Sequence, residues 1–221
     1  MAEQIIKILS KYGDVYLSGL GGTLWLALVT VLIGTLVGTI VALLKMVRFK
    51  PIGWIVSIYI EVLRGTPILL QLYFFWLLLP KIIPAALTDT QCVVTALIVN
   101  SSAYVSEIIR AGIQAVDIGQ REAAMSLGLT GFHTFSKVIL PQAVKNILPA
   151  LGNEFIVMVK ETSLASVFFV NELTTSYKTI QSATFLSIPS LTITGLIYLA
   201  INFVLSKAVA IAERRLKAGD R

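Results

Sequence analysis

The strongest constraint on the fold is the run from Thr23 to Leu44, which contains no charged residue. A helix needs roughly 20 apolar residues to cross a hydrocarbon core about 30 Å thick, and this run is long enough. Four further apolar stretches follow along the chain, at 52–79, 93–109, 147–170 and 188–206. A backbone in a bilayer must satisfy its hydrogen bonds internally, so we expect all five stretches to be helices. The sequence predicts an all-α, polytopic membrane protein with about five transmembrane helices in a single domain over residues 1–221.

Composition supports the membrane class. Hydrophobic residues make up 56% of the chain, charged residues 14%, and the mean hydropathy is +0.84. The net charge of +6 does not predict a nucleic-acid partner, because the basic residues lie between and after apolar runs instead of along one face. Cys92 is the only cysteine, so no intrachain disulfide can form. Neither a metal-ligand cluster nor a catalytic grouping emerges, and we expect a chain that is not an enzyme and binds no cofactor.

The distribution of Lys and Arg predicts the orientation of the spans. Twelve basic residues fall on one side of the predicted helices: Lys45, Arg48, Lys50, Arg110, Arg121, Lys137, Lys145, Lys207, Arg214, Arg215, Lys217 and Arg221. Four fall on the other side: Lys7, Lys11, Lys81 and Lys178. Cytoplasmic loops are enriched in basic residues, so we expect the amino terminus outside the cell and the carboxyl terminus in the cytoplasm.

The second apolar stretch, 52–79, carries an interruption in its middle. Pro67 removes a backbone donor there and leaves carbonyl groups near Leu63 without their helical partner. We interpret this segment as a kink, with Arg64 pairing with Glu61 on the same helix face three positions earlier. The alternative is a direct role of the segment in binding the substrate.

Two further spacings in the predicted spans suggest helix contacts. Glu107 and Arg110 are three residues apart and are expected to form an ion pair. Gly34 and Gly38 are four residues apart in the first span, a spacing that lets two helices approach closely. These glycines predict packing or dimerisation.

The polar stretch 110–144 is too hydrophilic to span a membrane, and its pattern is helix, turn, helix. Residues 122–127 are strong helix formers, 128–131 contain two glycines, and 132–140 resume helical spacing. Pro141 is expected to end or redirect the second helix. Three apolar residues on that helix recur on one face: Phe132, Phe135 and Ile139. Such a face on a cytoplasmic element would suit a groove on a partner.

The order Glu122-Ala123-Ala124, Gly128 and then Leu140-Pro141 resembles the signature loop of permease subunits in ATP-binding-cassette importers. Other segments resemble the polar amino-acid branch of these permeases, and together they extend over nearly the whole chain: 61–67, 103–110, 119–124, 139–143 and 160–166. The number of matches carries more weight than any one of them.

The resemblance implies an importer-permease-like bundle in a bacterial-type cytoplasmic membrane. It implies that a second permease subunit, the same or a different chain, completes the pathway, and that an extracytoplasmic binding protein delivers an amino acid. Cytoplasmic ATPase subunits would bind the 110–144 coupling loop and hold the ATP. The chain itself has no phosphate-binding loop of the Gly-x-x-x-x-Gly-Lys-Ser/Thr type.

Two acids in the fourth stretch, Glu154 and Glu161, are candidates for substrate binding. They are seven residues apart and so share one helix face, which should line the bundle interior or the substrate path because exposure to lipid is costly. There they would attract a cationic group of an amino acid. Two alternatives remain: the acids pair with Arg64 or Lys160, or they lie near a membrane surface. A different class of protein, a self-sufficient secondary transporter or channel, would use Glu154, Lys160 and Glu161 as an ion relay, and uptake by this chain alone would identify it.

Overall fold

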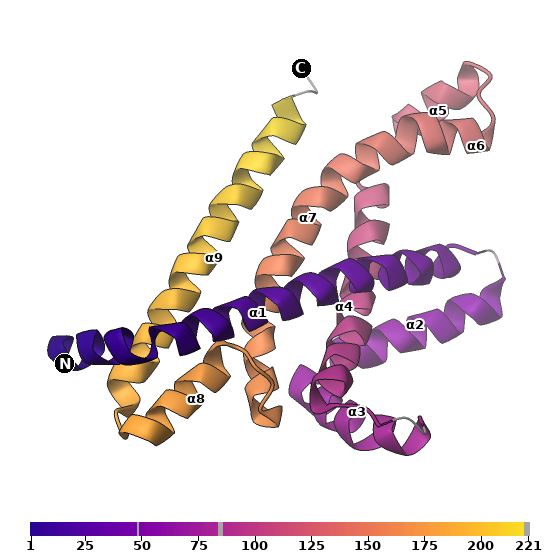
Figure 1. Cartoon of the computed structure of the whole chain (residues 1–221). Helices are drawn as coiled ribbons and strands as arrows, with labels where there is room; N and C mark the ends of the chain where they lie inside the picture. The colour runs from indigo at the N-terminus through magenta and orange to yellow at the C-terminus, as the bar shows by residue number, and fades with distance from the viewer. Residues whose placement is uncertain (48, 84–85, 219–221) are drawn as a thin grey trace.

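The computed structural model describes residues 1–47, 49–83 and 86–218, and within these ranges the chain is helical and contains no strand. Figure 1 shows the helices as a bundle that is splayed at one end. The elements in chain order are α1 (Ala2–Lys45), α2 (Lys50–Gly65), α3 (Ile68–Ile82), α4 (Asp89–Gln114), α5 (Ile118–Ser126), α6 (Gly131–Thr134), a π-helical turn η1 (Phe135–Ile139), α7 (Leu140–Glu161), a 3₁₀ segment η2 (Thr162–Phe168), α8 (Leu173–Thr184) and α9 (Ser187–Ala218). The predicted all-α membrane class is confirmed.

Within the described ranges, three single helices are long and apolar enough to cross a membrane: α1, α4 and α9. The second predicted span, 52–79, is not one helix, because α2 and α3 meet at a bend of 111° and together pass the same criterion only as a broken pair. The fourth, 147–170, is also not one α-helix, since α7 ends at Glu161 and continues as η2. Helix α7 is not among the candidate spans of the described residues, although it packs against α4, α9 and α1.

Close packing of α1 against α4 is the main contact of the bundle. Gly38 makes it possible, because a Cβ atom at this position would lie 2.8 Å from both the Ser102 carbonyl oxygen and the Val105 Cβ. At Gly34 a Cβ would approach the Ser101 hydroxyl to 3.0 Å. The predicted close approach at these glycines is therefore confirmed as packing within the chain.

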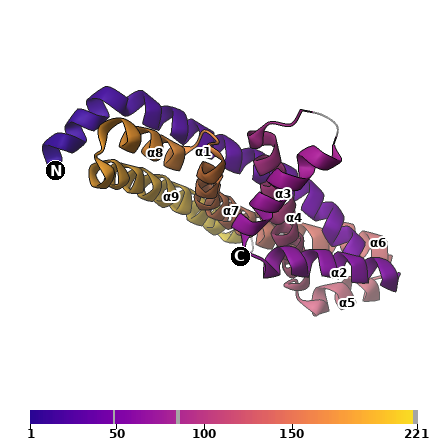
Figure 2. The ribbon, with the colours of Figure 1, turned by 90° about the horizontal axis from the view of Figure 1, so that it is seen from below.

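Helix α8, which the sequence did not predict, lies between α1 and α9 (Figure 2). Apolar residues from the three helices form one buried cluster: Ile8, Tyr16, Leu173, Ile180 and Ile193. Glu172 caps α8, and its fully buried carboxylate accepts hydrogen bonds from the Thr174 N–H (2.7 Å) and the Tyr198 hydroxyl (3.0 Å). These bonds fix the end of the bundle that lies opposite α5 and α6.

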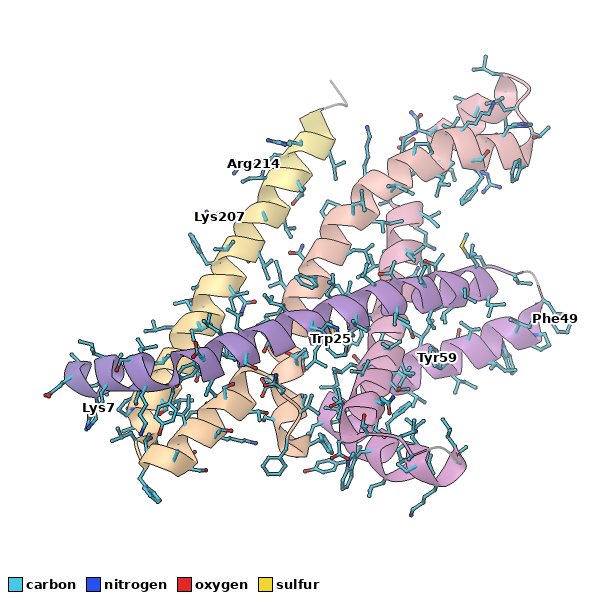
Figure 3. All side chains as sticks on the ribbon, in the orientation of Figure 1. Lys7, Trp25, Phe49, Tyr59, Lys207 and Arg214 are labelled. Carbon is cyan, nitrogen blue, oxygen red and sulfur yellow. The ribbon has the colours of Figure 1, made fainter. Side chains whose placement is uncertain are left out.

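Helices α5 and α6 project from the same end of the molecule as the carboxyl-terminal part of α9 (Figure 1). Lys207 and Arg214 lie along that part of α9, whereas Lys7 lies near the amino-terminal end of α1 (Figure 3). The 110–144 segment and the end of α9 therefore share one end of the bundle, as the distribution of basic residues requires.

Candidate functional site

The break between α2 and α3 is held open by two buried amides. Pro67 has no N–H to give to the Leu63 carbonyl, which instead accepts hydrogen bonds from Gln71 Nε2 (2.8 Å) and Asn100 Nδ2 (3.4 Å). Asn100 also donates to Gln71 Oε1 (2.9 Å) and so ties the break to α4. The predicted kink and the freed carbonyl are confirmed. The two amides escaped the sequence analysis, although a polar residue inside an apolar span is the signal that would have identified them.

A cavity of about 350 Å³ opens beside this break. Its walls come from the α2–α3 connection, from α4 and from α7, and its lining residues are Thr66, Pro67, Ile68, Asn100, Tyr104, Glu154, Val157, Met158 and Glu161. This volume lies within the range of small-molecule sites, roughly 300–1,000 Å³. The cavity combines apolar walls with a few polar groups, as such sites commonly do.

Both candidate acids line this one cavity, in agreement with their predicted position on one face of the helix. Glu154 is only 7% exposed, and its Oε1 accepts a hydrogen bond from Ser101 Oγ (3.2 Å). Across the part of the chain that the structure describes, neither Glu154 nor Glu161 forms an ion pair, so the alternative pairing with Arg64 or Lys160 does not occur. The cavity therefore holds two acids whose charges no described cation neutralises.

A cluster of charges centred on Glu107 lies next to the cavity. Its carboxylate pairs with Lys45 Nζ at 2.8 Å and with Arg110 Nη2 at 2.7 Å, and the second contact confirms the predicted pair within α4. Arg64 Nη1 lies 3.7 Å from the same carboxylate, so the prediction that Arg64 pairs with Glu61 was wrong. Sequence spacing within α2 could not reveal this contact, because it joins two helices far apart in the chain. The cluster connects the ends of α1 and α2 to α4.

The predicted helix–turn–helix of the 110–144 segment is formed by α5, the Gly128 turn and α6. Helix α5 carries Glu122, Ala123 and Ala124, of which only Ala124 is buried. Gly128 has φ of 85°, and two bonds of the Schellman type close the helix: Leu129 N–H donates to the Ala124 carbonyl (3.1 Å) and Gly128 N–H to the Met125 carbonyl (3.0 Å). The positive φ inferred for Gly128 is thus present.

Pro141 was predicted to end or redirect the second helix, and the first of these two outcomes was wrong. The chain remains helical from α6 through η1 into α7, and Pro141 lies in the first turn of α7, where a missing N–H is tolerated. The π-helical turn just before it takes up the change in hydrogen bonding. Leu140 and Pro141 are both exposed.

The tip of the coupling loop exposes several large apolar side chains. Their exposed fractions are 84% for Leu127, 77% for Phe132 and 72% for Ile118. Phe132 and Ile139 do not form one exposed apolar face as predicted, because Ile139 is only 9% exposed. Apolar groups gathered at an exposed tip are typical of a surface that binds another protein.

Residues 34–218 match the protein family described as binding-protein-dependent transport system inner membrane component. The chain belongs to this family. As a family member it is a multi-pass inner-membrane permease component, which confirms the resemblance found in the sequence and argues against a self-sufficient ion-driven transporter.

Curated relatives are similar over most of their length. The arginine transport system permease protein ArtQ of Bacillus subtilis (strain 168) is 39% identical over 92% of this chain and 93% of its own. The L-cystine transport system permease protein TcyB of the same organism is 38% identical, over 90% and 85%. The glutamine transport system permease protein GlnP of Escherichia coli (strain K12) is 36% identical, over 88% and 90%.

Solved structures share the fold. The crystal structure of an amino acid ABC transporter with histidines contains a chain that is 48% identical, with a TM-score of 0.90 over 94% of this chain and 96% of that one. A chain of the MetNI methionine ABC transporter in an inward-facing conformation has a TM-score of 0.73 over 98% and 99%, but at 16% identity it supports the fold alone.

Proposed function

We propose that this permease belongs to an ATP-driven importer of amino acids and that its cargo is a polar amino acid with a cationic group, bound by Glu161 and Glu154. The observation that carries the proposal is the pair of carboxylates that line one cavity of about 350 Å³ and form no ion pair with any described residue. Relatives named for arginine, glutamine and cystine transport support an amino acid as the cargo.

The chemistry of the cavity fits such a cargo. An ammonium or guanidinium group entering it would pair with Glu161 and Glu154 and offset the free energy that burying these acids costs. Tyr104 adds an aromatic ring to the same wall, and a cation over a tyrosine ring is stabilised by about 0.5–1 kcal/mol or more. Val157 and Met158 would contact the aliphatic part of the cargo.

The partners follow from the coupling loop and from the family. Cytoplasmic ATPase subunits would bind the exposed tip around Leu127 and Phe132, while Gly128 sets the angle of α5. This chain would then hydrolyse no nucleotide itself. A second permease subunit and an extracytoplasmic binding protein complete the assembly, with the amino terminus outside and the carboxyl terminus in the cytoplasm.

Uptake by the reconstituted importer tests the role of the acids. Glu161→Gln and Glu154→Gln keep the size of the side chain and remove its charge, so we expect each to lower uptake of the cationic cargo about tenfold or more while assembly with the ATPase persists. Glu3→Gln, an exposed acid at the start of α1, is the matched control and should transport normally. Normal uptake by both single variants and by the double variant would rule out the carboxylate site and leave family membership untouched.

The energy source for uptake is tested with the same importer reconstituted in lipid vesicles. We expect uptake to require ATP and the ATPase subunits. Transport by the permease alone along an ion gradient would instead support the relay of Glu154, Lys160 and Glu161.

A further inference from the structure

Arg64 lies between the Glu107 cluster and the substrate cavity. It belongs to the last turn of α2, and its guanidinium carbon is 5.4 Å from the centre of the Tyr104 ring. Tyr104 also lines the cavity, so Arg64 contacts a residue of the cavity wall. The Arg64 side chain is 44% exposed and is therefore not fixed by packing.

Glu107 does not need Arg64 as a partner. Its carboxylate already receives a hydrogen bond from Lys45 Nζ (2.8 Å) and bonds from Arg110 Nη2 (2.7 Å) and Nε (3.1 Å). The 3.7 Å contact of Arg64 is too long for a hydrogen bond. Three cations thus surround one acid, and Arg64 is the one held most loosely.

The cavity lacks a group that the cargo requires. Every free amino acid carries an α-carboxylate, and burying it without a cation or donor costs several kcal/mol. Among the residues that the structure describes, the lining includes two carboxylates but no Lys or Arg. Arg64 is a cation next to this lining, because its guanidinium contacts the ring of Tyr104, a lining residue.

We propose that Arg64 binds the α-carboxylate of the amino acid, exchanging its weak ion pair with Glu107 for a forked guanidinium–carboxylate pair. This inference rests on the proposed function and adds a specificity-determining residue to the same cavity. Arginine presents two parallel N–H donors to a carboxylate, so the pair is directional as well as strong. Gly65 and the non-helical Thr66 follow Arg64 directly and leave its end of α2 free of a continuing helix. Glu154 and Glu161 would then bind the cationic group of the cargo, and Arg64 would bind its α-carboxylate.

Direct binding to the permease–ATPase complex in nanodiscs, without a binding protein, tests the proposal. We compare the affinities of the complex for L-arginine, L-lysine, L-histidine and L-glutamine. The affinity for the amino acid that binds most tightly is then compared with the affinity for its own α-amide. The amide carries one more positive charge, so a cavity with two acids and no contribution from Arg64 would bind it at least as tightly. We expect the wild-type complex to prefer the free acid about 10- to 100-fold.

Variants separate a substrate contact from a role in the Glu107 cluster. Arg64→Gln should abolish the preference for the free acid, and Arg64→Lys should restore part of it. Lys45→Gln removes another cation from Glu107 without touching Tyr104 and should keep the full preference. An equal loss of affinity for acid and amide in Arg64→Gln, or an equal affinity for both in the wild type, would overturn the proposal.

The acids provide a separate readout. Glu161→Gln should weaken binding of the cationic side chain and leave the preference for the free acid in place. If Glu161→Gln has no effect but Arg64→Gln still abolishes the preference for the free acid, the proposal of a cationic cargo is wrong. The proposed role of Arg64 is then retained. If none of the four amino acids binds to the wild-type complex, the cavity is not the site and the role of Arg64 is overturned with it.

Discussion

Replacing Gly128 with valine should uncouple ATP hydrolysis from uptake while leaving the membrane helices intact. Gly128 has φ of 85°, a conformation that an L-residue with a Cβ adopts only with strain. A Cβ at this position would meet nothing within 4 Å, so the effect of the substitution is conformational and not a clash.

The expected magnitude follows from the backbone. The left-handed conformation costs an L-residue about 1–2 kcal/mol, and β-branched valine lies at the upper end of this range or beyond. This penalty shifts the balance between the formed and the open turn by a factor of about 5–30. Helix α5 has nine residues and buries only Ala124, so little tertiary packing compensates for the loss of its two closing hydrogen bonds.

Two substitutions in the same loop serve as controls. Gly128→Asn should retain most coupling, because asparagine tolerates the left-handed region. Gly131→Val should also be tolerated, since Gly131 has no positive φ and a Cβ added there would meet no atom within 4 Å. The assay is uptake per ATP hydrolysed in proteoliposomes. Equal ratios for Gly128→Val and Gly128→Asn would show that the left-handed turn does not transmit force.

Two further predictions concern orientation and packing. A cysteine introduced at Thr130 should react with a membrane-impermeant label only from the cytoplasmic side, and labelling in intact cells would reverse the predicted topology. Gly38→Ala should lower the thermal stability of the protein, because its Cβ would lie 2.8 Å from the Ser102 carbonyl oxygen on α4. Gly53→Ala, which meets nothing within 4 Å, is the control, and an equal melting temperature for both variants would contradict the packing argument.

Sequence reasoning succeeded where the signal is local. Apolar runs predicted the helices, and glycine chemistry predicted the turn at Gly128, because both depend on properties of consecutive residues. The shared face of Glu154 and Glu161 also followed from helix geometry alone. These features need no knowledge of which helices pack together.

The failures involve contacts between distant segments. Arg64 was assigned to Glu61 by spacing, whereas its partner Glu107 comes from another helix. Gln71 and Asn100 were overlooked because each has a function only once α3 and α4 are side by side. Pro141 was interpreted as a helix end because the π-helical turn that accommodates it has no simple sequence signature.

One continuous helix joins the coupling loop to the cavity lined by Glu154 and Glu161. Helix α7 begins at Leu140, beside the loop, and ends at Glu161 in the cavity wall. Its 22 residues extend about 33 Å at a rise of 1.5 Å per residue. Near its start, α7 packs on α4 so closely that a Cβ at Gly112 would overlap the Ile147 side chain. A partner that moves α5 therefore acts on η1 and the base of α7. Because α4 carries Asn100 and Tyr104, two of the three cavity walls, those from α4 and α7, lie on helices that adjoin the loop.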